Sequence, residues 1–257
     1  MESDNKLASS QSTSVLIVQD IRQRFGGLVA LDGVGFEVSP GEVLGIIGPN
    51  GAGKTTLFRI IAGEQVPWQG HISLKGQQIT GLPTHTIRRM GIAVTHQIED
   101  AFKSMSVFDN IMVAALFGSE QSIPFEVAAK QVESALQTTG LTTRYADRVM
   151  DLNVVDRKRV ELARAIVNRP AVLMLDELFS GINLEMVRPL ARAIIDISNM
   201  GTAVIVVEHL MGIVRALCPR IIMLSEGRLL TQGTPDEVFR DPRVITSYLG
   251  EAGGAHA

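Results

Sequence analysis

The run Gly48-Pro49-Asn50-Gly51-Ala52-Gly53-Lys54-Thr55-Thr56 constrains the fold of this chain more than any other feature. It fits the pattern G-x-x-x-x-G-K-[ST], in which glycines let consecutive backbone N–H groups turn toward anionic oxygen. The apolar segment Val43–Ile47 before it predicts a buried strand, and Leu57–Ala62 after it predicts a helix whose N-terminus adds positive potential. This order predicts an α/β fold with a phosphate-binding loop. A Gly-rich turn without a ligand is the alternative.

The side chains of this loop suit a nucleoside triphosphate with Mg²⁺. Lys54 can reach the β- and γ-phosphates, and the hydroxyl of Thr55 can hold the metal. We expect the phosphates to be bound by the loop as a whole, namely Gly48, Pro49, Asn50, Gly51, Ala52, Gly53, Lys54, Thr55 and Thr56.

Composition sets the class of protein. The chain has 257 residues, 46% of them hydrophobic and 20% charged, which suits one large globular α/β domain. A net charge of −3 gives no field for nonspecific binding to nucleic acid, and a solvated helix face explains the short cluster Arg157-Lys158-Arg159. The single cysteine, Cys218, excludes an intrachain disulfide.

The ends and the hydropathy of the chain indicate its compartment. No apolar run approaches the ~18 residues that a transmembrane helix requires. The first residues are polar and unlike a secretory signal. We therefore expect a protein of a reducing, cytosolic compartment that meets a membrane only through partners.

The hydrophobic pattern predicts one domain with two tails. Residues 1–13 are polar and Ser-rich and predict a disordered tail, residues 14–250 form the domain, and residues 251–257 form a second tail. Within the domain, residues from about 99 to 155 predict an inserted helical subdomain, with helices over Val107–Leu116 and Pro124–Gln137.

Strands are predicted on both sides of this insert. The continuously apolar segments Ala171–Leu175 and Ala203–Val207 are typical of parallel strands covered on both faces. Further strands are expected at Val15–Ile21, Val34–Val38, Gly70–Leu74, Gly91–Val94 and Ile221–Leu224.

Three more helices and a helix start follow from periodicity and capping. Pro83–Met90, Arg157–Val167 and Met186–Ser198 are expected to be helical, the last with Pro189 near its first turn. Thr234 as N-cap, Pro235 as the first helical residue and Glu237 as the closing residue predict a capping box.

Acidic residues follow one of the apolar strands. Asp176, at the carboxyl end of Ala171–Leu175, can hold Mg²⁺, and the adjacent Glu177 can polarise an attacking water. Acids are also common where a strand gives way to a turn, so this pair gains weight only beside the phosphate loop.

Three single residues complete the candidate site. His209 follows Ala203–Val207 and can contact a γ-phosphate, because ligand groups in open α/β sheets gather at the carboxyl ends of strands. The uncharged amide of Gln97 can contact Mg²⁺ without altering the net charge of the site, and Phe25 can stack on adenine. The alternatives are an ordinary strand-end histidine, a polar loop residue and a core phenylalanine.

The order of these parts resembles the ATP-binding subunits of ABC transporters, from about Val15 to Leu249. The resemblance implies a P-loop NTPase core of the ABC ATPase type, with an inserted helical subdomain and an antiparallel β subdomain. It also implies hydrolysis of ATP with Mg²⁺. Some stretches are similar to the ATPase subunits of branched-chain amino-acid importers: Arg24–Leu28 with Ala30-Leu31, Gly91–Ala93 leading to Gln97, Phe102–Val107, and Asp241–Ile245 with Tyr248–Gly250.

The resemblance implies a role for each matching residue. Phe25 would stack on adenine, and Asp176 would support Mg²⁺ together with Thr55 and Gln97. Glu177 would be the general base and His209 would position the γ-phosphate. Gln97 would also couple the metal to a membrane partner.

One segment departs from the family pattern. The family's Leu-Ser-Gly-Gly-Gln signature falls on Leu152-Asn153-Val154-Val155-Asp156, in register with the well-matched Arg159–Ala165. In the family this segment presses on the γ-phosphate held by the other subunit. Branched side chains and an added carboxylate are expected to weaken that contact, at a cost of about 1–3 kcal/mol for a desolvated charge. About 1.4 kcal/mol is a tenfold loss of rate.

The chain's own ATP contacts are intact, whereas its contribution to the opposite site is altered. We therefore expect a heterodimer with a second ABC ATPase subunit, bound to permease subunits on the inner face of the cell membrane and indirectly to a solute-binding protein. An ATP-gated, weakly hydrolytic subunit with a regulatory role is the alternative. The Asp176-Glu177 pair and the helical insert argue against a third interpretation, a small-molecule kinase.

Overall fold

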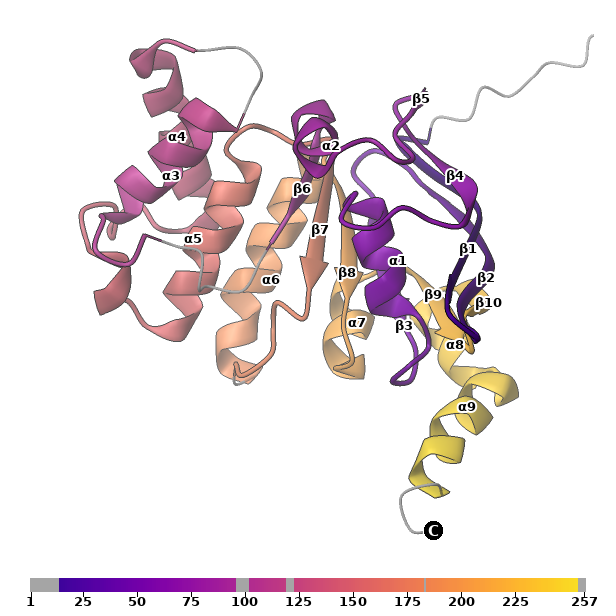
Figure 1. Cartoon of the computed structure of the whole chain (residues 1–257). Coiled ribbons are helices and arrows are strands. Elements are labelled where there is room, and N and C mark those ends of the chain that lie inside the picture. Colours follow the sequence, from indigo (N-terminus) through magenta and orange to yellow (C-terminus); the bar gives the residue numbers. More distant parts are fainter. Residues whose placement is uncertain (1–13, 96–101, 119–122, 183, 254–257) are drawn as a thin grey trace, which may run out of the picture.

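A computed structural model describes residues 14–95, 102–118, 123–182 and 184–253. The described chain contains a larger mixed sheet, a smaller antiparallel sheet and a group of helices beside the larger sheet (Figure 1). The α/β class, with its helical part and its antiparallel sheet, is confirmed.

The larger sheet carries the ends of the strands on which the candidate site depends. Its strand order is β10-β9-β3-β8-β7-β6; the strands from β9 to β6 run parallel to one another, and β10 is antiparallel to β9. The six strands are β3 (Val43–Ile47), β6 (Ile92–Val94), β7 (Val172–Asp176), β8 (Ala203–Val207), β9 (Arg220–Ser225) and β10 (Arg228–Gly233). Because β3, β7 and β8 are parallel neighbours, the residues that follow them meet at one edge.

The smaller sheet has the order β2-β1-β4-β5 and is antiparallel throughout. Its strands are β1 (Leu16–Phe25), β2 (Leu28–Val38), β4 (Gln69–Leu74) and β5 (Gln77–Gln78). Helix α1 (Lys54–Ile61) lies between the two sheets (Figure 1), and its buried Leu57 and Ile61 share one core with residues of β1, β2 and β3. Helix α2 (Thr84–Met90) adds Ile87 to the same core.

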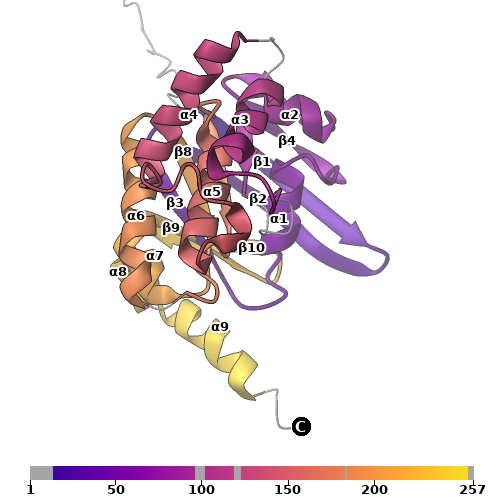
Figure 2. The same ribbon diagram turned by 90° about the vertical axis from the view of Figure 1, so that its left-hand side faces the viewer.

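A helical part occupies one side of the molecule, at the left in Figure 1 and facing the viewer in Figure 2. It consists of α3 (Val107–Phe117), α4 (Phe125–Thr139), the short 3-10 helix η2 (Val149–Asp151) and α5 (Val154–Ile166). Buried residues such as Val132 and Leu162 join it to β7, β8 and α6 (Leu184–Asn199) in a second core. Pro189 lies inside α6 and not near its first turn, because the helix begins earlier than the sequence predicts.

The C-terminal part contains α7 (Met211–Leu217), α8 (Pro235–Arg240) and α9 (Pro242–Gly253). The predicted capping box at the start of α8 is confirmed: Thr234 accepts from the Glu237 backbone N–H, and the Glu237 carboxylate accepts from the Thr234 N–H at 2.8 Å. Helix α9 projects from the body (Figures 1 and 2), and Ser247 on it hydrogen-bonds Ser225 of β9 at 2.9 Å.

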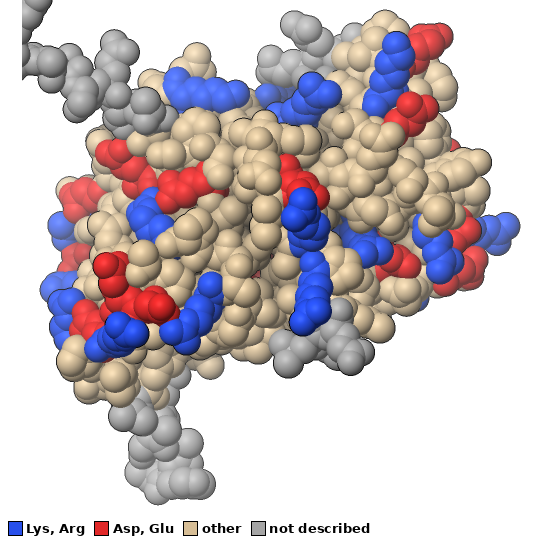
Figure 3. All heavy atoms as spheres, turned by 180° about the vertical axis from the view of Figure 1, so that it is seen from behind, with Lys and Arg blue, Asp and Glu red and all other residues tan. Residues whose placement is uncertain are grey.

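Charged side chains of both signs are interspersed on the face shown in Figure 3. Asp32 of β2 pairs with Arg22 of β1 and, at 2.5 Å, with Arg228 of β10, so ionic contacts tie the two sheets together. In the described ranges, no helix combines the length and the apolar character that a membrane crossing requires.

Candidate nucleotide site

Glycines shape the loop between β3 and α1. Gly48, Gly51 and Gly53 have φ angles of 149°, 75° and 99°, a region that L side chains rarely adopt. A Cβ at Gly48 would lie 2.2 Å from the Leu224 carbonyl oxygen, and one at Gly53 would lie 2.6 Å from that of Ala30. At Gly51, apart from this residue and its two chain neighbours, no atom of the described residues comes within 4 Å of that position. The loop therefore packs closely against the rest of the protein at Gly48 and Gly53, whereas it is open at Gly51. This opening suits a bound anion.

Lys54 lies across this loop. Its ammonium donates to the carbonyl oxygens of Gly48 at 2.6 Å and Pro49 at 2.8 Å. Helix α1 begins at Lys54, and its first turn continues with Thr55 and Thr56, without an acidic side chain. The ammonium and the positive end of the helix dipole therefore act at the same place, as an anion site requires.

A second turn supports the loop from the far side. The Gly227 N–H, between β9 and β10, donates to the Ala52 carbonyl at 3.2 Å, and its own carbonyl accepts from the Asp32 N–H at 2.8 Å. A Cβ at Gly227 would lie 2.7 Å from the Ala30 carbonyl oxygen. Glycine is therefore required at Gly227 as well, and the hairpin packs between the phosphate loop and β2.

The predicted catalytic pair comes together at the ends of β7 and β8. The register pairs Asp176 with Val207, so Glu177 and Glu208 both follow at the sheet edge. The Glu177 carboxylate lies 3.8 Å from Nδ1 of His209, and both side chains are about half exposed. Glu177 has a positive φ of 47°, an unusual conformation for a residue with a side chain.

Asp176 lies beside this pair in a partly buried position. Burial raises the pKa of Asp176, and the neighbouring Glu177 adds to the rise, whereas Arg59 and Lys54 act in the opposite direction. A divalent cation at this carboxyl would favour its charged form. The donor set of Asp176 with the exposed Thr55 hydroxyl suits Mg²⁺, which uses one or two carboxylates and completes its shell with water and substrate phosphates. Among the described residues, His, Cys, Asp and Glu form no group of three or more that could hold a metal.

The remaining predicted residues differ in outcome. Phe25 ends β1 and is 50% exposed, so the core alternative for it is wrong, while adenine stacking stays a prediction. Gln97 lies outside the described residues. Pro49, Asn50, Ala52 and Thr56 lie in or beside the loop that the sequence predicts.

Sequence reasoning missed two charged residues near the site. Glu208 is only 1% exposed, and its Oε1 accepts from the Phe179 N–H at 3.0 Å. The sequence did contain a signal for Glu208, because an acid directly after a fully apolar strand and before a candidate histidine has no simple packing explanation. Arg59 of α1 was missed because it comes close enough to Asp176 to affect the pKa of that carboxyl only in the folded chain.

The altered signature segment forms a self-capped helix N-terminus. Asn153 is the N-cap of α5, and its side-chain oxygen accepts from the Asp156 N–H at 2.9 Å. The Asn153 amide donates back to Asp156 at 2.8 Å, and Arg159 donates to the other oxygen of that carboxylate at 2.9 Å. Asp156 is 7% exposed. The N-terminus of α5 therefore holds a carboxylate of its own.

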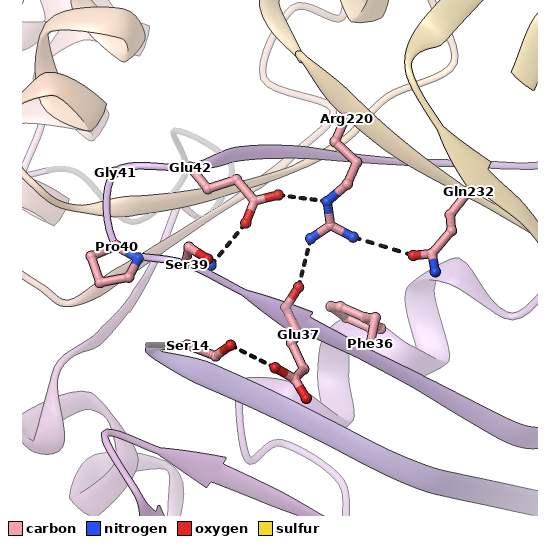
Figure 4. A pocket seen from close by; sticks show the side chains of 9 residues that line it. All are labelled: Ser14, Phe36, Glu37, Ser39, Pro40, Gly41, Glu42, Arg220 and Gln232. Carbon is pink, nitrogen blue, oxygen red and sulfur yellow. Dashed lines mark hydrogen bonds and ion pairs between the residues drawn. The ribbon is translucent and has the colours of Figure 1, made fainter. Parts of the chain in front are cut away.

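A hollow at the opposite end of β3 is organised by one arginine (Figure 4). Arg220 donates to Glu42 at 2.7 Å, to the Glu37 carbonyl at 2.6 Å and to Gln232 at 3.2 Å. The guanidinium is thereby used to fasten β9 to β10 and to the connection before β3. The contacts of Arg220 therefore help to join the two sheets, and this hollow is not a second anion site.

The loop, the strand-end carboxylates and the α/β scaffold define a nucleotide-binding cassette. Two family profiles match the chain: ABC transporter over residues 31–180, and branched-chain amino acid ATP-binding cassette transporter over residues 228–254.

Individual proteins are similar over nearly the whole chain. The branched-chain amino acid transport ATP-binding protein LivG of Escherichia coli K12 is 35% identical over 94% of this chain and 100% of its own length. The lipopolysaccharide export ATP-binding protein LptB of Acidithiobacillus ferridurans is 35% identical over 93% and 98%. The crystal structure of the ADP conformation of MJ1267, an ATP-binding cassette, superposes with a TM-score of 0.84 at 25% identity, covering 92% and 99%. The chain therefore belongs to the ABC transporter family, as an ATP-binding cassette with ATPase chemistry.

Proposed function

We propose that this chain binds Mg-ATP at an interface with a second ATPase subunit and powers the uptake of branched-chain or related amino acids. It would act through permease subunits, at the inner face of the cell membrane, with a solute-binding protein supplying the solute. The phosphate loop, together with Glu177 and His209 just after the ends of β7 and β8, is the observation that carries the ATPase part. The amino-acid part is supported by the branched-chain profile, which covers β10, α8 and α9.

Each residue of the site has a task that its position supports. Lys54 and the N-terminus of α1 would hold the β- and γ-phosphates, and Phe25 would stack on adenine. Thr55, Asp176 and Gln97 would hold Mg²⁺, which neutralises phosphate charge when bound. Glu177 would accept the proton of the attacking water, and His209, 3.8 Å away, would orient the γ-phosphate.

The N-terminus of α5 supports a heterodimer. In a dimer of this family, it would face the γ-phosphate held by the other subunit. Here Asp156 is fixed there by Asn153 and Arg159, so a carboxylate would meet a phosphate. Two like charges destabilise such a contact. A partner with an unaltered signature would complete the site on Lys54 and Glu177, and the opposite site would turn over slowly.

The same observation favours a second candidate function, an ATP-gated subunit that closes on nucleotide and hydrolyses weakly. The substitution Glu177→Gln separates the two functions in the assembled transporter. In a motor subunit, hydrolysis is expected to fall at least ~100-fold while Mg-ATP binding stays within about threefold, because only the proton acceptor is lost. In a gate, turnover is low at the outset and changes little.

The matched control is Glu133→Gln, an exposed carboxylate on α4 that is expected to leave turnover unchanged. Calorimetry that detects no magnesium-dependent binding of adenine nucleotide to the folded chain would contradict both candidates. Uptake of labelled leucine by proteoliposomes, abolished by Glu177→Gln, tests the amino-acid part separately.

A further inference from the structure

The turn after β7 is attached to the end of β8 at two points. The Glu177 N–H donates to the Val207 carbonyl at 2.9 Å, and the Phe179 N–H donates to the Glu208 carboxyl at 3.0 Å. The Ser180 N–H donates to the Glu177 carbonyl at 3.0 Å and closes the turn. The segment that carries Glu177 is therefore held both by the backbone of β8 and by one side chain beyond it.

The Glu208 side chain is unusual for a residue that only stabilises the fold. Glu208 is 1% exposed, and burial raises the pKa of its carboxyl. Within the described residues, its second oxygen, Oε2, is buried without a hydrogen-bond partner. Burying a carboxyl with one oxygen unsatisfied costs free energy. Stability alone therefore does not explain a glutamate here.

The position of Glu208 links the two residues of the candidate catalytic pair. It is covalently next to His209, and it holds the backbone two residues after Glu177. Glu177 has a φ of 47°, a conformation that persists in a residue with a side chain only when its surroundings enforce it. The hydrogen bond from the Phe179 N–H to Glu208 is one of those constraints. It holds the turn against the segment after β8, which also bears His209.

We propose that Glu208 is a positioning residue for ATP hydrolysis, whose carboxyl oxygen fixes the turn bearing Glu177 relative to His209. This inference rests on the proposed roles of Glu177 and His209. It assigns Glu208 no contact with nucleotide. Its loss should therefore change the rate of the chemical step and not the affinity for ATP.

A series of substitutions in the full chain, assayed with its partner subunits, tests the proposal. Glu208→Gln keeps an acceptor oxygen at the same reach and is expected to keep kcat within about threefold of the wild type. Glu208→Leu removes the acceptor and Glu208→Asp withdraws it, so kcat is expected to fall about 10- to 100-fold. KM for Mg-ATP should stay within about threefold in all three variants.

Two measurements separate positioning from loss of stability. Hydrogen exchange of the peptide that contains Phe179 is expected to accelerate in the Leu and Asp variants and not in the Gln variant. Val132→Ala, a core substitution on α4, lowers stability far from the strand ends and should leave kcat unchanged.

The outcomes distinguish this inference from the function on which it rests. A wild-type assembly without ATP turnover overturns the proposed function, and this inference with it. Normal turnover in wild type, Leu and Asp variants alike overturns only the role of Glu208. Equal losses in the Gln and Leu variants also overturn it, because they would show that charge matters and the hydrogen bond does not.

Discussion

Two helix N-termini, those of α1 and α5, show how the same backbone geometry serves opposite purposes. Both expose N–H groups and the positive end of a helix dipole. At α1 the residue before the helix is Gly53, which has no side chain to cap it, and Lys54 adds a positive charge. At α5 the cap is Asn153, and the first turn contains Asp156 with Arg159 bound to it.

The difference teaches that the side chains around a helix N-terminus decide whether it can receive a ligand. At α1 the glycines leave room and the charge is favourable for an anion. At α5 the chain provides its own anion and satisfies it internally. In the proposed dimer, the first arrangement would serve the site formed by this chain's own phosphate loop, and the second would weaken the site that it would share with a partner.

The largest expected effect tests the α1 half of this comparison. Lys54→Ala would remove the charge-assisted hydrogen bonds that Lys54 is proposed to donate to two phosphates, each worth about 1.5–3 kcal/mol, and should weaken Mg-ATP binding about 100-fold or more. Isothermal titration calorimetry measures it, with the exposed Lys130→Ala on α4 as the matched control. Undiminished affinity would break the comparison, because α1 would then not be the anion site.

An intermediate effect tests the α5 half. Asp156→Asn removes the carboxylate but keeps the size of the side chain, and it should raise ATP turnover of the assembled transporter up to about tenfold if the group opposes a phosphate. Steady-state ATPase assays measure the change. The neighbouring exposed acid gives the control Asp151→Asn, which is expected to have no effect. Slower turnover in the Asp156 variant would show that α5 tolerates, or uses, this carboxylate.

The smallest effect concerns Asp176, whose pKa is raised mainly by burial. A raised pKa means that the folded chain holds the proton more tightly than the unfolded chain, so this group favours folding more as the pH falls through its folded pKa. At pH 7 the ionised form opposes folding. Asp176→Asn should therefore raise Tm of the nucleotide-free chain, by about 2–4 °C for each kcal/mol that the ionised carboxyl costs the fold.

The gain in Tm from this substitution should shrink as the pH falls, because protonation relieves the cost of Asp176 in the wild type, and the substitution should also remove the magnesium dependence of ATP binding. Scanning calorimetry between pH 5 and 8 measures the first effect and titration calorimetry the second. A lower Tm in the Asn variant would mean that Asp176 stabilises the fold through contacts of its own and that its ionised form does not oppose folding.

Local signals in the sequence predicted local structure well. The fully apolar strands β3 and β8 and the capping box of α8 form as expected, because each depends on residues close together in the chain. Helix α7 was missed, since Leu210 before it is apolar and gives no capping signal. Strand β2 was predicted only from Val34, because Asp32 and Gly33 interrupt its apolar pattern while its pairing with β1 continues to Leu28.

Long-range contacts could not be predicted in this way. The pairing of β6 with β7 joins segments on either side of the helical part, and periodicity says nothing about which strands are neighbours. The same limit applies to the site. The loop and the strand-end acids follow from motifs, whereas the link from Glu208 to Phe179 depends on the order of β7 and β8 in the sheet.

The turn at Gly227 governs how this chain can be shortened or fused. Its N–H supports Ala52 in the phosphate loop, and it packs against Ala30 without room for a side chain. A truncation after Ser225 would thus remove part of the nucleotide cradle and not a dispensable appendage. Affinity tags and reporter domains belong after Gly253, where α9 ends.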